Sequence, residues 1–203
     1  MGVPERKERE KMEMKELIKS AALKLFLEDG VPKTSIRNIA DQIEYSPGTI
    51  YLYYKDKDEL LYDMQSDAFA KLQRAFIDNV TSPIPVVRLQ QLGRTYVSFG
   101  LANPELYDLM FIIRAPTNVD EEVHKANGEN CLNFLNKCLS DCIDDGSLIV
   151  TDLNFAVLQV WATAHGLVSL NLRCRLKVTG AKEEEVPATL LATMESYINS
   201  ITK

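Results

Sequence analysis

Two short helical patterns joined by a three-residue turn constrain the fold of this 203-residue chain more than any other feature. Residues 36–43 place their apolar side chains on one helical face. Residues 47–54 follow Ser46, a residue type that caps helices, and begin with Pro47, which favours the first helical position. The turn between the two segments is residues 44–46. This arrangement predicts a helix-turn-helix.

The second helix of such a motif enters the major groove of DNA by its N-terminal end. Ile50 and Tyr54 are four residues apart and predict its inner face, which leaves its other residues available to a partner. That outer set contains no Arg, Asn or Gln, so it lacks the bidentate contacts to guanine or adenine. It offers hydroxyl groups for phosphates and apolar groups for thymine methyls. The cations near the motif suit phosphate contacts, and they are Lys33, Arg37, Lys55 and Lys57.

Residues 17–61 resemble the DNA-binding domain of the TetR (tetracycline repressor) family. They contain T-S-I-R-x-I-A followed without a gap by S-x-G-T-I-Y-x-Y-Y-K-x-K-x-E-L-L. The resemblance implies a dimeric, ligand-released transcriptional regulator that binds a double-stranded DNA operator and carries an all-helical effector domain. Pro47 and Leu52 stand where family members usually carry a cation and often carry His, respectively.

The same resemblance implies roles for individual residues. It implies phosphate-backbone contacts by Thr34, Ser35, Arg37, Thr49, Tyr51, Tyr53 and Lys57. It places Pro47, Gly48 and Leu52 nearest the bases.

Pro and Gly recur along the whole chain at intervals that separate helical patterns, and no segment predicts a convincing strand. We therefore expect an all-α protein of about nine helices, with a three-helix DNA-binding domain at residues 1–62 and a ligand-binding and dimerisation domain at residues 63–203. The net charge is −6, which argues against non-specific coating of nucleic acid. Residues 1–62 carry 11 basic and 12 acidic residues, a balance of −1, so the acidity lies mainly in the second domain.

The predicted helices of the second domain include residues 86–102, 119–145, 152–175 and 185–201. The segment VWATAHGLVSL resembles the Trp-x-x-x-His-Gly signature of one branch of TetR C-terminal domains, through Trp161, His165 and Gly166. The last two helices are broadly apolar and predict a four-helix dimer interface, although the same pattern fits a monomer core. The residues assigned to this homodimer interface are Leu167, Leu170, Leu190, Leu191, Met194 and Ile198.

Aromatic and flexible apolar residues gather between positions 86 and 172, which predicts a pocket for an apolar or amphipathic small-molecule effector. The same residue types fill protein cores, so each of these residues could line a pocket or belong to the core. Arg114 could neutralise an acidic ligand or extend to the surface. His165, among apolar neighbours, fits a hydrogen-bonded core residue better than a metal ligand or pH switch. The predicted pocket consists of Tyr96, Phe99, Met110, Phe111, Arg114, Trp161 and His165.

The chain shows no nucleophile–base pair, no phosphate-binding loop and no metal-ligand spacing, so we expect neither catalysis nor a cofactor. Cys131, Cys138 and Cys142 recur on one helical face and fit a packed helix better than a redox sensor. No apolar run reaches the ~20 residues of a membrane span, and no signal peptide is visible, which predicts a cytoplasmic protein. A DNA-binding activator, a ligand-independent regulator and a helical scaffold are the alternatives to a ligand-released repressor.

Overall fold

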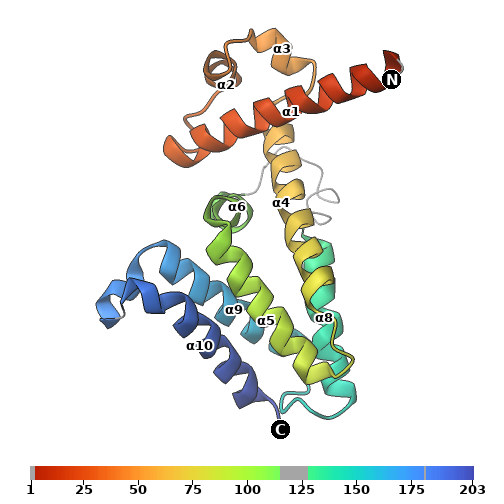
Figure 1. Cartoon of the computed structure of the whole chain (residues 1–203), viewed down its shortest axis with the longest axis vertical. Coiled ribbons are helices and arrows are strands. Elements are labelled where there is room, and N and C mark those ends of the chain that lie inside the picture. The colour runs from red at the N-terminus through yellow and green to blue at the C-terminus, as the bar shows by residue number, and fades with distance from the viewer. Residues whose placement is uncertain (1–2, 115–127, 181) are drawn as a thin grey trace. The chain divides into compact units, whose positions relative to one another are not determined.

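The computed structural model describes residues 3–114, 128–180 and 182–203, and within these ranges the chain is helical (Figure 1). The predicted all-α fold of about nine helices is confirmed, and the described residues hold only one isolated β-bridge, between Leu148 and Thr202. Residues 119–127 of the predicted long helix lie outside the described ranges. Nine α-helices lie in the described ranges, and they are α1 Val3–Glu28, α2 Ile36–Gln42, α3 Pro47–Tyr51, α4 Lys57–Asn79, α5 Pro85–Ala102, α6 Pro104–Tyr107, α8 Glu129–Asp144, α9 Leu153–Leu172 and α10 Val186–Ile201.

Two compact units make up the chain, one of Met1–Ala68 with Glu105–Asn127 and the other of Phe69–Pro104 with Gly128–Lys203. The domain boundary expected at residue 62 falls inside α4, which contributes residues to both units. A π-helical turn, Asp108–Ile112, follows α6 in the first unit. Two short 3-10 helices, Arg175–Thr179 and Glu183–Glu185, precede α10 in the second.

The first unit is built on a small apolar core shared by α1, α2, α3 and the start of α4. Gly30 adopts a left-handed φ of 85° just after α1 and ends that helix, as a residue without a side chain does most easily. Ile50 and Tyr54 are both buried as predicted, but α3 ends at Tyr51, so Tyr54 lies beyond the helix that is expected to reach it. The other large buried residues of this core include Ile18, Phe26, Ile39, Leu60 and Leu61.

A polar cluster joins three parts of this unit around the carboxylate of Asp63 on α4. We call residues 47–54, which are α3 and the three residues after it, the recognition segment. The hydroxyl of Tyr54, its last residue, donates a hydrogen bond of 2.8 Å to Asp63. From α1, the Lys19 ammonium lies 2.9 Å from Asp63 and also pairs with Asp67. Lys15 lies 3.6 Å from Asp63, and its ammonium is 4.9 Å from the centre of the Tyr54 ring. These contacts fix α1 and the end of the recognition segment to α4.

The ionisation of the cluster follows from these contacts. Burial alone would raise the pKa of Asp63, but hydrogen bonds from Lys19 and Tyr54 outweigh it and hold that pKa below 3.8. Burial would lower the pKa of Lys19, but its hydrogen bonds to Asp67 and Asp63 raise that pKa. Burial and the Asp63 charge raise the pKa of Tyr54 well above its ordinary value. At neutral pH, Asp63 and Lys19 are therefore charged and Tyr54 is a neutral donor.

Helix α4 has one further polar attachment within the first unit. The buried amide of Gln65 donates a 2.9 Å hydrogen bond to the backbone carbonyl of Leu109. Leu109 lies in the π-helical turn, where the wider helical geometry leaves carbonyls without a partner four residues on. The Gln65 amide therefore donates a hydrogen bond to the Leu109 carbonyl, which has no α-helical hydrogen bond from the residue four positions on.

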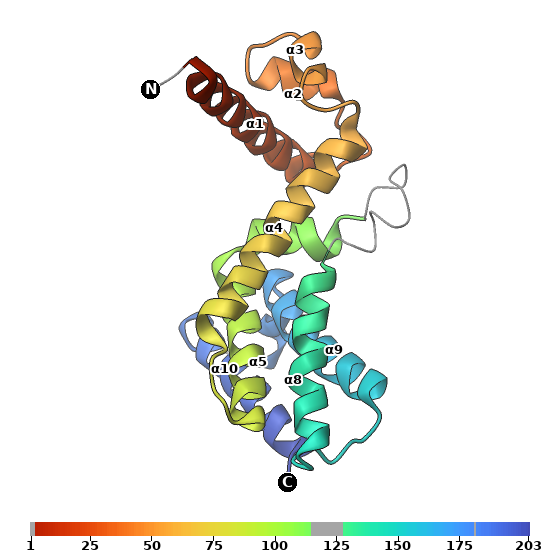
Figure 2. The same cartoon turned by 90° about the vertical axis from the view of Figure 1, so that its right-hand side faces the viewer.

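The second unit packs α5 against α8, α9 and α10 (Figure 2). Helix α10 approaches α5 closely at Gly93, where a Cβ atom would lie 2.9 Å from Ile198 and 3.0 Å from Met194. Helix α9 is long and apolar enough to cross a membrane by length and composition alone, a property that core helices of water-soluble proteins share.

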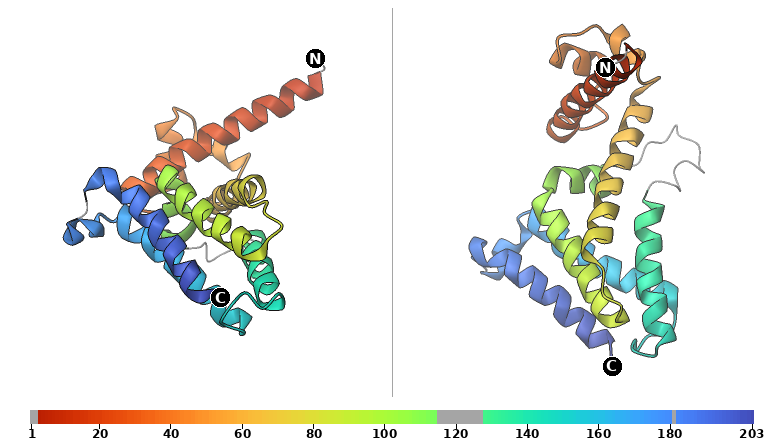
Figure 3. Two further views of the ribbon diagram at one scale, coloured as in Figure 1. Left: turned by 60° about the horizontal axis from the view of Figure 1, so that its bottom comes forward. Right: turned by 45° about the vertical axis from the view of Figure 1, so that its right-hand side comes forward.

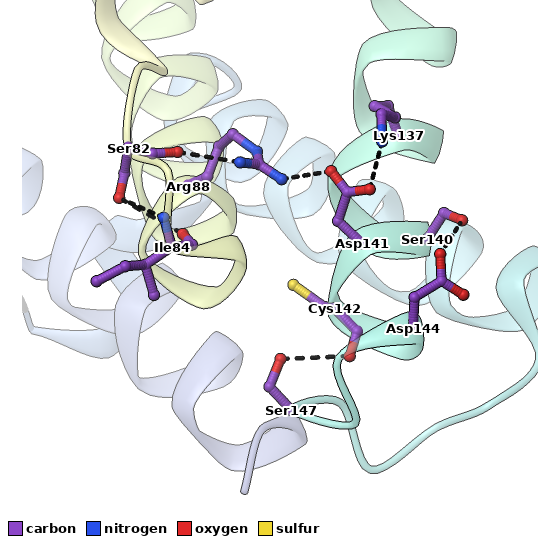
Figure 4. Close-up of polar contacts among 9 residues, drawn as sticks. All are labelled: Ser82, Ile84, Arg88, Lys137, Ser140, Asp141, Cys142, Asp144 and Ser147. Carbon is purple, nitrogen blue, oxygen red and sulfur yellow. Dashed lines mark hydrogen bonds and ion pairs between the residues drawn. The ribbon is translucent and has the colours of Figure 1, made fainter.

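Arg88 links α5 to α8 through its guanidinium (Figure 4). It donates to the carbonyl of Ser82 at 3.0 Å and pairs with Asp141, which also pairs with Lys137. Beside this ion pair, Cys138 and Cys142 are buried, and burial raises the pKa of Cys142 to about 11. Its thiol is therefore protonated and unreactive at neutral pH, as the packed-helix interpretation of these cysteines requires.

The cluster around Asp63 makes a prediction about acid stability. Asp63→Asn removes the charge that Lys19 and Tyr54 share, and we expect the free energy of unfolding at pH 7 to fall by about 2 kcal/mol. Because the folded-state pKa of Asp63 is depressed, its contribution is complete well above the ordinary pKa of an aspartate and is lost as the pH falls through the lower folded-state pKa. Chemical denaturation at pH 7 and pH 3 should therefore show a difference between wild type and variant that shrinks in acid. Asp41→Asn, at an exposed carboxylate on α2, is the control and should change stability little. An Asp63→Asn effect no larger than this control would contradict the prediction.

Candidate DNA-binding site

The recognition helix α3 is fixed at its N-terminus by Ser46. The Ser46 hydroxyl accepts a 3.2 Å hydrogen bond from the backbone N–H of Thr49 and lies 3.1 Å from the Thr49 hydroxyl. Pro47 occupies the first helical turn, where its missing N–H costs no hydrogen bond. The cap and the proline thus start the helix at a defined residue, as the sequence predicts.

The outer side chains of α3 are exposed beside a fully buried inner face. Tyr51 is 55% exposed and Leu52 is 81% exposed, whereas neighbouring Ile50 and Tyr54 are buried. Gly48 is exposed, Pro47 and Thr49 are half-buried, and Tyr53 is half-buried beyond the end of the helix. A leucine that is this exposed contributes nothing to the core, so it is available for contact with another molecule.

The turn between α2 and α3 contains Glu44 in a left-handed conformation, with a φ of 60°. This region is unfavourable for a residue with a side chain, and the turn of this motif often holds glycine there. Backbone hydrogen bonds hold the turn on α2, from the Glu44 N–H to the Asp41 carbonyl at 3.3 Å and from the Tyr45 N–H to the Ala40 carbonyl at 3.0 Å. Tyr45, the next residue, is 44% exposed between α2 and the Ser46 cap. Sequence reasoning missed Tyr45 as a surface residue because it lies in the turn, outside either helical face.

The N-terminus of α2 presents two of the predicted contacts. Ser35 is its N-cap, and its hydroxyl accepts a 3.2 Å hydrogen bond from the backbone N–H of Asn38. The Asn38 side chain accepts in return from the Ser35 N–H at 2.9 Å, which completes a capping box. Arg37 is exposed and forms no ion pair with a residue in the described ranges. Its guanidinium is therefore free for a phosphate.

Thr34 differs from its predicted role. It is only 3% exposed, and its hydroxyl donates to the backbone carbonyls of Gly30 at 3.0 Å and Leu25 at 3.3 Å. Those bonds satisfy carbonyl groups at the C-terminal end of α1. The side chain of Thr34 therefore faces inward in this structure, where it is not accessible to a phosphate.

Lys57, at the start of α4, is held by the same turn. Its ammonium donates to the carbonyl of Val31 at 2.5 Å and to the carbonyl of Thr34 at 2.7 Å. Two of its three N–H groups are thus used inside the unit. By contrast, Lys33 and Lys55 have exposed side chains. The structure therefore gives Lys57 a role in positioning the loop before α2, which the sequence pattern alone does not reveal.

The predicted pocket residues are divided between the two units. Met110, Phe111 and Arg114 belong to the first, where Met110 is buried and Phe111 lies 5.1 Å from Tyr107, ring centre to ring centre. Arg114 is exposed. The other four predicted residues, Tyr96, Phe99, Trp161 and His165, belong to the second unit. Burial lowers the pKa of His165 below its ordinary value, so its ring is neutral at neutral pH.

The second unit contains a groove of about 570 Å³ between α4 and α5. Of the predicted pocket residues, only Phe99 lines it. Trp161 is 40% exposed on α9 and lies outside this groove. The groove combines apolar and polar groups, and its lining residues are Ala75, Asn79, Val87, Gln90, Gln91, Arg94, Thr95, Ser98 and Phe99.

The predicted dimer-interface residues fall into two groups. Leu190, Met194 and Ile198 are buried inside one chain, where α10 packs on α5, so they are core residues and are not available to a partner. The apolar face of α10 that they form is buried within the same subunit. Leu170 is exposed, and Leu167 and Leu191 are half-buried. Helix α9 instead exposes side chains that the prediction omitted, which are Phe155 and Leu158.

Two family models match this chain, one in its N-terminal part and one in its C-terminal part. Residues 18–64 match the family described as bacterial regulatory proteins, tetR family. Residues 89–194, about half of the chain, match the tetracyclin repressor-like C-terminal domain. The HTH-type transcriptional regulator HbdR of Aromatoleum sp. (strain CIB) is 27% identical over an alignment of 165 residues, with coverage of 75% of this chain and 70% of that protein.

Solved structures share the fold. A TetR family transcription regulator from Marinobacter aquaeolei VT8 has a TM-score of 0.72 at 19% identity, over 98% of this chain and 99% of that one. A protein of unknown function from Rhodococcus sp. RHA1 has a TM-score of 0.74 at 22% identity, over 93% of this chain and 95% of that one. The two family models match both the DNA-binding domain and the C-terminal domain. The chain therefore belongs to the TetR family and is a ligand-responsive, DNA-binding transcriptional regulator.

Proposed function

We propose that this protein is a homodimeric repressor of the cytoplasm that binds a palindromic operator and leaves it when an amphipathic small molecule binds. The observation that carries the DNA-binding part is the contrast on α3, where exposed Tyr51 and Leu52 adjoin buried Ile50 and Tyr54. A two-fold symmetric dimer requires a two-fold symmetric site, with its recognition helices about 34 Å or a multiple apart.

The roles of the DNA-facing residues follow from their exposure. Leu52, Pro47 and Gly48 meet base edges through apolar contact. Phosphates are contacted by Ser35, Arg37, Thr49, Tyr51 and Tyr53, and we add Lys33 and Lys55 to this set. Thr34 and Lys57 act indirectly, by holding the turn between α1 and α2 through their hydrogen bonds to backbone carbonyls.

The exposed apolar side of α9 supports a dimer. Phe155 is 54% exposed, Leu158 is 62% exposed, and Trp161 is 40% exposed, at spacings of three residues along one helix. An apolar surface of this kind on a folded unit indicates an interface with another protein. Because Leu190, Met194 and Ile198 are internal, we assign the contact to α9 together with the outward residues of α10, such as Leu191.

The groove between α4 and α5 supports an amphipathic effector. Its volume falls in the range of small-molecule sites. Phe99 and Val87 offer apolar surface, while Gln90 and Arg94 offer donors. Arg94 already pairs with Glu195 at 2.8 Å, an exposed ion pair that a ligand carboxylate could replace at little cost. Binding of such a ligand would shift the population away from DNA-competent dimers.

The roles on α2 and α3 predict different effects of two substitutions. Leu52→Ala should change the order of preference among operator variants, because it removes an apolar contact to base edges. Arg37→Gln should weaken binding to every variant about equally and make the salt dependence shallower by about one counterion. Binding titrations on a panel of selected duplexes at several salt concentrations measure both effects. Lys24→Gln, at an exposed cation on α1, is the control for a change in net charge. A change in base preference caused by Arg37→Gln would contradict these assignments.

The dimer assignment is tested by a charge on α9. Leu158→Glu should weaken association by about 3 kcal/mol, roughly a hundredfold, because the dimer would bury an unpaired carboxylate. Since Leu158 is exposed in one chain, the variant should keep its helical content. Analytical ultracentrifugation over a concentration series gives the result. Ile77→Glu, at a residue 50% exposed on α4, is the matched control and should leave the dimer intact. Equal association of both variants would place the interface elsewhere.

The groove is tested by filling it. Ser98→Trp places an indole in the groove from an exposed position on α5, so we expect normal folding and normal operator affinity without ligand. Decanoate, an amphipathic acid, should weaken operator binding by wild type and not by Ser98→Trp. The coupling must be reciprocal, so the operator complex should bind decanoate more weakly by the same factor. Val178→Trp, at an exposed residue of the second unit, is the control. Equal responses of wild type and Ser98→Trp to decanoate would exclude the groove as its site.

A further inference from the structure

Helix α1 begins at Val3, fifteen residues before Ile18, the first fully buried residue of that helix. Residues 5–13 are exposed on all sides, and Figure 3 shows these turns extending beyond the other helices of the first unit. We call residues 5–13 the α1 overhang. A helix that is polar all round needs ion pairs along its surface. The overhang has two at i,i+4 spacing, Arg6–Glu10 at 2.7 Å and Arg9–Glu13 at 3.5 Å.

Two lysines of the overhang lie on the face of α1 that further along enters the core. Lys7 and Lys11 precede the fully buried Ile18 by eleven and seven residues, and both separations return to nearly the same helical face. Along that face the residue type changes from apolar to lysine where the helix leaves the body of the unit. Neither lysine forms an ion pair within the described ranges, in contrast to Arg6 and Arg9.

The same line of lysines leads to the end of the recognition segment. Lys7, Lys11, Lys15 and Lys19 are spaced by four residues. Lys19 and Lys15 are neutralised by Asp63 of α4, and the Lys15 ammonium lies over the ring of Tyr54. Each four-residue step moves about 6 Å along the helix axis. The two unpaired lysines therefore continue outward along α1 from the point where Lys15 contacts Tyr54.

We propose that the α1 overhang is an additional DNA-contact surface, in which Lys7 and Lys11 bind phosphates of the duplex that flanks the bases contacted by α3. This inference rests on the proposed operator binding. Residues 5–13 carry four acidic and four basic side chains, so the overhang is neutral as a whole. DNA is the occupant that Lys7 and Lys11 favour, because they form no ion pair in the described residues and lie on the helix whose Lys15 contacts Tyr54. A lysine ammonium binds phosphate as a flexible point charge. Contacts of this kind add affinity and salt dependence without adding base preference.

The test compares two double variants that remove the same charge from the overhang. Lys7→Gln/Lys11→Gln removes the unpaired lysines, and Arg6→Gln/Arg9→Gln removes the paired arginines. Affinity for a selected operator with at least ten flanking base pairs on each side is measured against salt concentration. Two lost phosphate contacts should make the slope of log affinity against log salt shallower by about 1.8 per subunit. The arginine variant should change the slope by less than half of that, and Lys7→Arg/Lys11→Arg should restore the wild-type slope.

Flank length separates a local contact from a general effect of charge. Trimming the duplex to the sequence under the recognition helices should weaken wild type and abolish its difference from Lys7→Gln/Lys11→Gln. Equal slopes for the lysine and arginine variants, or a difference that persists on the trimmed duplex, would overturn the proposal and leave the lysines as a solvated face. In both cases wild type still binds its operator. If wild type selects no duplex from a random pool, the proposed operator binding itself fails.

Discussion

The carboxylate of Asp63 is the point on which the geometry of the first unit depends. It accepts a hydrogen bond from Tyr54 at the end of the recognition segment and an ion pair from Lys19 on α1, and it is carried by α4. Removal of this one charge would leave two polar groups without their partner, and the end of α3 would lose its attachment to the longest helices of the unit. The exposed face of α3 can therefore act as a rigid surface although the helix itself has only five residues.

Local patterns allowed much of the DNA-binding unit to be predicted. The Ser46 cap, Pro47 and the four-residue spacing of Ile50 and Tyr54 are short-range signals, and each corresponds to what the structure shows. Thr34 and Lys57 could not be assigned in the same way. Their partners are backbone carbonyls, which the sequence does not distinguish, and in the case of Lys57 those carbonyls lie 23 and 26 residues away. A threonine or lysine near a recognition helix looks the same in sequence whether it faces DNA or closes a turn.

The C-terminal helices show a different limit of pattern analysis. An apolar stripe records that a face is buried, but the sequence does not state whether the same chain or a second copy covers it. On α10 the stripe of Leu190, Met194 and Ile198 is covered by α5, made possible by the small residue Gly93. On α9 part of the apolar surface, including Leu158, remains exposed. The position of a glycine on another helix therefore decides which stripe is core, and that information is tertiary.

The distribution of paired and unpaired cations explains how an acidic protein can approach DNA. In the second unit Arg74, Arg88, Arg94 and Lys137 each pair with a carboxylate. In the first unit Lys15 and Lys19 are likewise neutralised, whereas Arg37, Lys7 and Lys11 carry charge that no described residue balances. The net charge of −6 disfavours general attraction to a polyanion, so we propose that local cations of the first unit supply the phosphate contacts. A protein of this kind dissociates readily from DNA that does not satisfy its local contacts, and that property suits a regulator that must distinguish an operator from the rest of the genome.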